Sequence, residues 1–174
     1  MVDILLFEIA IVLVLAWTKV YSHDRAGGLF ANLEEAKKKN VDDENAELFS
    51  ILYDLESMRN DAGVFHFKLC HPERTEEAFP CNEWKQSSNP VLESTVTGFV
   101  AIRLTWPLRS DGQAFGGLMK SNPGNNLMDD DPSAYWWNSV GTLSDYHGKI
   151  PGPVGAGKNY IPVMKKQLFV YKEV

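Results

Sequence analysis

The sequence predicts an all-β protein, an antiparallel β-sandwich or jelly roll with a short N-terminal helical leader. Two features favour this class: polar and apolar residues alternate along several segments, and Gly- and Pro-rich turns separate these segments. The chain shows no helix-strand alternation and no clear repeat. With 174 residues, 44% of them hydrophobic, it can build one domain with a substantial core.

Residues 1–22 are predicted to be a signal peptide. Ile4–Trp17 is almost continuously apolar, which is the length of a signal-peptide core and is short of the ~20 residues that span a bilayer. Val20-Tyr21-Ser22 then offers a site for cleavage after Ser22, and the mature protein is expected to be secreted, with no membrane contact. Because Asp3 and Glu8 are atypical of signal peptides, an uncleaved membrane anchor or a buried helix is the alternative.

Residues 23–47 are expected to form a charged helical leader or linker. Apolar residues at helical spacing, together with Glu and Lys four residues apart, predict an amphipathic helix around residues 29–38. A pro-segment that is cut near Lys37–Lys39 is an alternative to an ordinary exposed leader.

Residues 48–174 are predicted to form a single β-sandwich domain. Leu48–Met58 and Val64–Cys70 flank the turn cluster Arg59–Gly63 and resemble a β-hairpin. In Val64–Cys70 His66 falls on the polar face, where a structural role is expected. The other face of this strand carries Phe65, Phe67 and Leu69. Further strands are expected at residues 95–106, 115–119, 135–143 and 163–173.

Cys70 and Cys81 are predicted to form a disulfide, because two cysteines around a short loop pair in an oxidising compartment. A metal site is the rival interpretation, but His66 and His71 are the only further ligands nearby and their spacing is poor. A catalytic thiol is the other rival.

The net charge of −6 argues against nucleic-acid binding, which requires a basic face. Gly152–Lys158 matches the spacing of a phosphate-binding loop. However, Asn159 replaces the Ser or Thr that would hold Mg²⁺, and Pro162 follows where a helix must begin. A nucleotide site is therefore not expected.

No enzymatic activity is expected. Ser144, Asp145 and His147 are close in sequence, but no nucleophile elbow or metalloprotease motif surrounds them. A cluster of three carboxylates is formed by Asp129, Asp130 and Asp131, and bound Ca²⁺ would reduce the repulsion between them. Their spacing matches no EF-hand loop. Calcium is the cofactor that this cluster would bind, and ordinary turn chemistry is the alternative.

Aromatic residues supply the predicted ligand-binding site. Trp136 and Trp137 are consecutive in an expected strand, so they point to opposite faces, and a two-layer core accepts one of them. Exposed Trp and Tyr rings suit sugar stacking or protein contact, whereas buried rings would simply fill the core. The predicted ligand-binding residues are Trp84, Tyr135, Trp136, Trp137, Tyr146 and His147.

Several segments resemble a group of uncharacterised secreted, Trp-rich proteins of cnidarians such as corals and sea anemones. The resemblance covers residues ~48–174, implies an extracellular location and carries over no catalytic residues. It is carried by Phe65–Leu69, Asn82–Pro90, Gly116–Leu118, Trp136–Gly141 and Ile150–Pro153.

Together these observations predict a secreted recognition or adhesion module that binds a glycan or an extracellular protein. A structural component of an extracellular or mineral-associated matrix is the first alternative. A secreted hydrolase is the second, and it is supported by nothing beyond free carboxylates.

Overall fold

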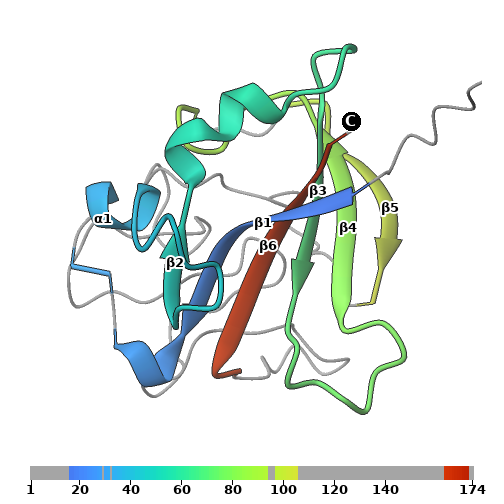
Figure 1. Ribbon diagram of the computed structural model, residues 1–174. Helices are drawn as coiled ribbons and strands as arrows, with labels where there is room; N and C mark the ends of the chain where they lie inside the picture. Colours follow the sequence, from blue (N-terminus) through green and yellow to red (C-terminus); the bar gives the residue numbers. More distant parts are fainter. Residues whose placement is uncertain (1–15, 29, 32, 94–96, 106–162, 173–174) are drawn as a thin grey trace, which may run out of the picture.

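The computed structural model describes residues 16–28, 30–31, 33–93, 97–105 and 163–172. Within these ranges six strands form one antiparallel sheet in the order β2-β1-β6-β3-β4-β5 (Figure 1). This confirms the all-β class. The elements are β1 (Ala16–Asp24), the 3-10 helix η1 (Arg25–Gly27), α1 (Leu33–Lys37), β2 (Leu48–Ser50), the 3-10 helix η2 (Leu52–Met58), β3 (Phe65–Cys70), β4 (Cys81–Gln86), β5 (Val100–Leu104) and β6 (Lys165–Lys172).

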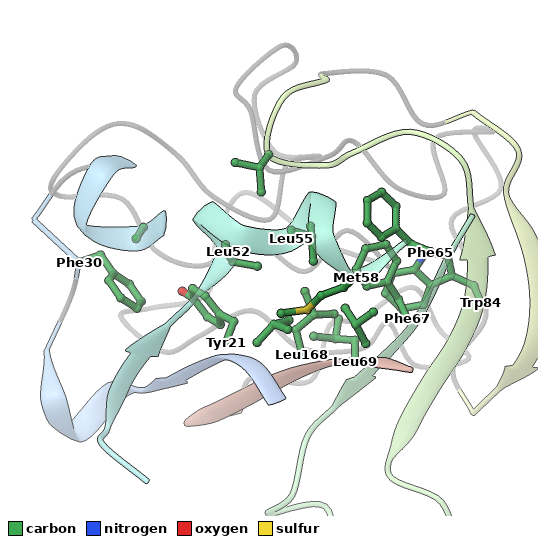
Figure 2. Packing of buried hydrophobic residues seen from close by; sticks show 14 of the residues in the cluster. Tyr21, Phe30, Leu52, Leu55, Met58, Phe65, Phe67, Leu69, Trp84 and Leu168 are labelled. Atoms are coloured by element: carbon green, nitrogen blue, oxygen red, sulfur yellow. The ribbon is translucent and has the colours of Figure 1, made fainter. Parts of the chain in front are cut away.

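The core lies on one face of this sheet, called here the inner face. Phe65, Phe67 and Leu69 of β3 are at most 1% exposed, which confirms the alternation predicted for this strand. Leu168 and Val170 of β6 are fully buried beside them, and η2 packs over the same face (Figure 2). Removal of this apolar surface from water is the main stabilising contribution.

Strand β1 is an internal strand of the sheet. It pairs with β6 along most of its length and with β2 on its other side. Its Val20 and Tyr21 are fully buried. The predicted cleavage after Ser22 falls within this strand, and the predicted domain start at residue 48 lies beyond it. Both boundaries stay predictions, but the sheet itself includes residues 16–24.

The predicted hairpin between Leu48–Met58 and Val64–Cys70 is wrong. Strand β2 ends at Ser50 and pairs with β1, whereas β3 pairs with β4 and β6. Leu52–Met58 forms η2 instead, and its buried Leu52, Leu55 and Met58 are three residues apart. Residues at this spacing eclipse one another along a 3-10 helix, so all three reach the core.

The predicted leader packs against the domain. Within residues 29–38, where a helix is expected, α1 covers Leu33–Lys37. Ala36 of α1 is fully buried in the core. Just after α1, the backbone of Lys39 exchanges two hydrogen bonds with Ser50 of β2, at 3.0 and 2.8 Å. The lysine-rich segment is therefore tied to the edge of the sheet.

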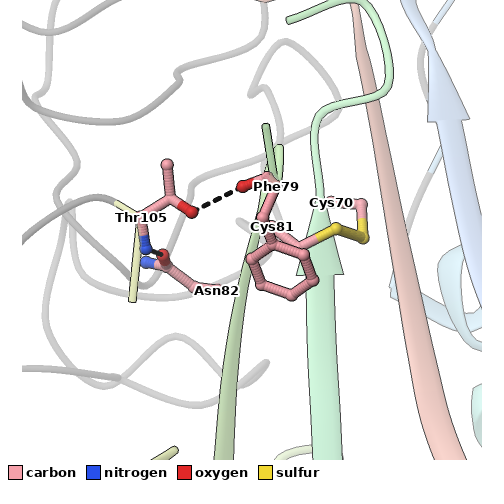
Figure 3. The surroundings of a disulfide bond; sticks show 5 residues. All are labelled: Cys70, Phe79, Cys81, Asn82 and Thr105. Atoms are coloured by element: carbon pink, nitrogen blue, oxygen red, sulfur yellow. Dashed lines mark hydrogen bonds between the residues drawn. A yellow bond between two sulfur atoms is a disulfide. The ribbon is translucent and has the colours of Figure 1, made fainter. Parts of the chain in front are cut away.

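The disulfide between Cys70 and Cys81 is confirmed. It joins directly opposite residues of β3 and β4, at the end of the two strands. Next to it, Thr105 donates hydrogen bonds to Phe79 and Asn82, so the chain after β5 is fastened to the same end of β4 (Figure 3).

Strand β5 confirms part of the strand expected at residues 95–106, and β6 confirms the strand expected at residues 163–173. The expected strands at residues 115–119 and 135–143 lie outside the described residues. Among the helices described, none has the length and apolar character needed to cross a membrane.

Candidate functional site

The outer face of the sheet, opposite the core, carries a surface pocket of about 370 Å³. Four strands meet there, because β6 pairs with both β1 and β3, and β3 pairs with β4. The register aligns Trp17 with Tyr171 and His66 with Lys85, so these side chains share one face. The lining residues, called here the outer pocket, are Trp17, Asn60, His66, Glu83, Lys85 and Tyr171.

Three rings form one wall of the outer pocket. The centroid of Trp17 lies 4.9 Å from that of His66 and 5.5 Å from that of Tyr171, and both pairs meet edge to face. His66 and Tyr171 are 5.2 Å apart. All three residues are partly exposed. Edge-to-face contacts of this kind are favourable and hold the rings in fixed orientations.

A carboxylate partner fixes the histidine. His66 Nε2 and Glu83 Oε1 are 2.7 Å apart, and each side chain is 18% exposed. The carboxylate therefore orients the imidazole ring and selects which nitrogen faces it. Glu83 of β4 pairs directly with Lys68 of β3, so the outer face carries both positive and negative side chains.

Lys68 supports the aromatic wall from the side. Its Nζ lies 4.0 Å from the ring centroid of Trp17 and 5.1 Å from that of Phe169, which are cation–π distances. Burial lowers the pKa of the Lys68 ammonium, and the nearby Glu83 carboxylate opposes this shift. The contact positions Trp17 without occupying the pocket, since Lys68 is not among the lining residues.

Asn60 is held by the turn between η2 and β3. Its Oδ1 accepts hydrogen bonds from the backbone N–H groups of Ala62 (3.1 Å) and Val64 (3.0 Å). This is an Asx-type turn, which fixes the side chain. Because Oδ1 is used twice within the turn, the amide Nδ2 is the group that Asn60 can offer to a ligand.

Trp84, a predicted ligand-binding residue, belongs to the core. It is fully buried, its ring packs 5.5 Å from Phe67, and its Nε1 donates to Gln86 Oε1 at 2.8 Å. A ligand on the surface cannot reach this ring. The other predicted site residues lie outside the described residues; they are Asp129, Asp130, Asp131, Tyr135, Trp136, Trp137, Tyr146 and His147.

The outer pocket was not predicted from the sequence. One signal was present, since His66 and Lys68 fall on the polar face of a well-predicted strand. Trp17 ends an apolar run that is typical of a signal peptide, and Glu83 and Lys85 belong to β4, for which the sequence predicts no strand. A site assembled from five separate segments appears only when the strand order is known.

The inner face carries a second polar group, formed by His23, His71 and Lys166, each at most 1% exposed. Burial lowers the pKa of His23 from 6.5 to about 4, against the opposing effect of a contact with the Gly28 carbonyl. Burial also lowers the pKa values of His71 and Lys166 well below their usual ranges. Burial therefore disfavours the charged form of all three side chains.

The buried His23 is expected to make the protein less stable as the pH falls from 6.5 to 5. The unfolded chain protonates His23 near pH 6.5, whereas the folded chain resists protonation until about pH 4, so acid favours unfolding. His23 alone should lower the unfolding free energy by about 2 kcal/mol over this window. Urea unfolding at several pH values measures this loss, which His23→Gln should reduce. Equal stability at pH 7 and pH 5 would contradict it.

Comparison with known proteins gives no match: no family model, no curated protein and no solved structure matches this chain. Within the part of the chain that the structure describes, no group of three or more His, Cys, Asp or Glu residues could hold a metal ion. The site therefore has to be interpreted from its own geometry.

Proposed function

We propose that this chain is a secreted recognition module that binds a saccharide in the outer pocket. One observation carries the proposal: the rings of Trp17 and Tyr171 meet fixed hydrogen-bonding groups in a single surface pocket. Apolar faces that border a few placed polar groups are the usual chemistry of a small-ligand site. Sugars present both kinds of surface, with apolar C–H faces and a rim of hydroxyl groups.

The polar groups of the pocket suit hydroxyl groups. Glu83 supplies acceptor oxygens, Lys85 supplies donors on an exposed side chain, and Asn60 supplies an amide. His66 adds a ring nitrogen that Glu83 holds in place. A ligand with several hydroxyl groups can pair with these groups without large rearrangement, because the turn and the strands already fix most of them.

Secretion is part of this proposal and is supported by the Cys70–Cys81 disulfide, which is compatible with an oxidising compartment. Within the same proposal, the described sheet is one layer of the sandwich or jelly roll that the strand pattern predicts.

The experiment is a binding measurement against a glycan panel, followed by variants of the outer pocket. Tyr171→Ala should weaken the best ligand at least tenfold, about 1.4 kcal/mol. Gln167→Ala is the matched control: it lies on the same face of β6 but outside the pocket, so its affinity should equal that of the wild type. Equal affinity in the wild type and Tyr171→Ala, or the same loss in both variants, would contradict the proposal.

The His66–Glu83 pair favours a second candidate function, hydrolysis of the bound saccharide. A histidine oriented by a carboxylate is a common arrangement for a general base, which here would activate a water molecule. Release of reducing ends from the bound glycan, lost in His66→Gln while binding persists, would support this function. Intact glycan after prolonged incubation would leave recognition as the function.

A further inference from the structure

Three basic residues form a row across the inner face of the sheet. His23 of β1 pairs directly with Lys166 of β6. On the other side of β6, Cys70 at the end of β3 pairs with Gln167. His71 follows Cys70 and therefore lies beside Lys166. Side chains opposite one another on neighbouring strands are about 5 Å apart. All three are at most 1% exposed, so the row lies inside the protein.

The charged groups that face this row are mostly positive. Arg25 and Lys166 act on His23, and Arg74 and Lys166 act on His71. Among the residues that the structure describes, Asp24 is the one acid that acts on the row; it follows His23, and its carboxylate also lies 3.6 Å from Lys165 Nζ. The row therefore has an excess of basic groups over acidic ones.

Two buried donors of this region have no acceptor among the described residues. They are the Nζ of Lys166, which is completely buried, and the Nε of Arg74. A buried donor without an acceptor costs free energy, and a buried amine without a counter-charge costs more. The histidines, in contrast, are held by the backbone: His23 Nε2 lies 3.0 Å from Gly28 O, and His71 contacts the backbone of Lys165.

We propose that Lys166 and Arg74, flanked by His23 and His71, bind a small oxyanion such as phosphate or a carboxylate. A planar or tetrahedral oxyanion offers several acceptor oxygens around one charge, which fits two donors that belong to neighbouring segments and both lie near His71. The row lies near the strand ends, because Lys166 is the second residue of β6 and His71 follows the last residue of β3. The Nη2 of Arg74 meets Glu76 at the surface, so this side chain connects the row to solvent.

The experiment measures thermal unfolding of the full chain in increasing sodium phosphate, sulfate or acetate, with sodium chloride at equal ionic strength as the reference. At roughly 100 times the Kd, the bound anion should raise Tm by about 5 °C or more. Binding should tighten as the pH is lowered, by up to about tenfold per pH unit, because burial lowers the pKa of Lys166 and the anion favours its protonated form. The arms with phosphate, sulfate and acetate distinguish a tetrahedral anion from a carboxylate.

Two lysine variants decide whether the row is the site. Lys166→Met should fold, with a higher Tm than the wild type in chloride, since an apolar chain of similar length replaces a buried amine. The same variant should lose the response to the anion. Lys165→Met, one residue away and ion-paired with Asp24, should keep the response. A saturable response that survives in Lys166→Met, or no response of the wild type to any of the three oxyanions, would overturn the proposal. This site is independent of the outer pocket.

Discussion

A chain that begins at His23 will not fold, whereas a chain that begins at Leu15 will fold like the full-length protein. The shorter chain lacks Ala16–Ser22, seven of the nine residues of β1. It therefore loses the strand that joins β2 to β6 and two fully buried core residues, Val20 and Tyr21. Domains are stable by about 5–15 kcal/mol, and the loss of an internal strand exceeds this range.

Near-UV circular dichroism and urea unfolding of the two chains measure this effect. The Leu15 chain is the matched control, because it keeps β1 whole. A cooperative transition of the His23 chain at the midpoint of the longer chain would show that β1 is dispensable. The same reasoning applies to the proposed secretion. If the protein is secreted after removal of an N-terminal segment, N-terminal sequencing should find a start before Trp17, upstream of the predicted cut.

Trp84→Ala is expected to cost about 3–5 kcal/mol of unfolding free energy, which is the usual range for a fully buried aromatic residue. The ring packs against Phe67, and its Nε1 donates to the buried side chain of Gln86. The substitution therefore creates a cavity and also leaves a buried acceptor without its donor. Such a loss would bring a domain of average stability close to unfolding.

Trp84→Phe is the matched variant for this prediction. It keeps most of the apolar volume but removes the indole N–H. The unfolding free energy of Trp84→Phe should therefore lie between those of the wild type and Trp84→Ala. Urea midpoints of the three proteins give the comparison. A loss below about 1 kcal/mol for Trp84→Ala would show that the ring does not fill the core.

The elements that the sequence predicted well are those with a clear local period. In β3 and β6 buried residues alternate with partly exposed ones, and this period of two is a property of the strand itself. Strand β4 was missed because Trp84 is surrounded by polar residues, and Asn82 and Gln86 proved to be buried polar partners of the core. A polar residue that is buried with hydrogen bonds has no signature in hydropathy.

The wrong predictions concern which segments, distant in sequence, pair with one another in the sheet. An apolar run such as Ile4–Trp17 suits a signal core, a helix or a buried strand equally well, and β1 begins within it. The turn at Arg59–Gly63 indicated a reversal of the chain but did not specify which strand β3 would pair with. Strand order is decided by packing across the whole domain, so the outer pocket followed from the structure alone.

The measurement that tests the role of the outer pocket most directly is a nuclear magnetic resonance titration of the indole N–H signals with the best glycan. The chain has five tryptophans, and each gives one such signal, assigned by single Trp→Phe variants. The Trp17 signal should shift saturably, while that of the buried Trp84 should stay in place. Saturable shifts of the Trp136 or Trp137 signals with an unmoved Trp17 would contradict the outer pocket and locate binding on the predicted aromatic segment instead.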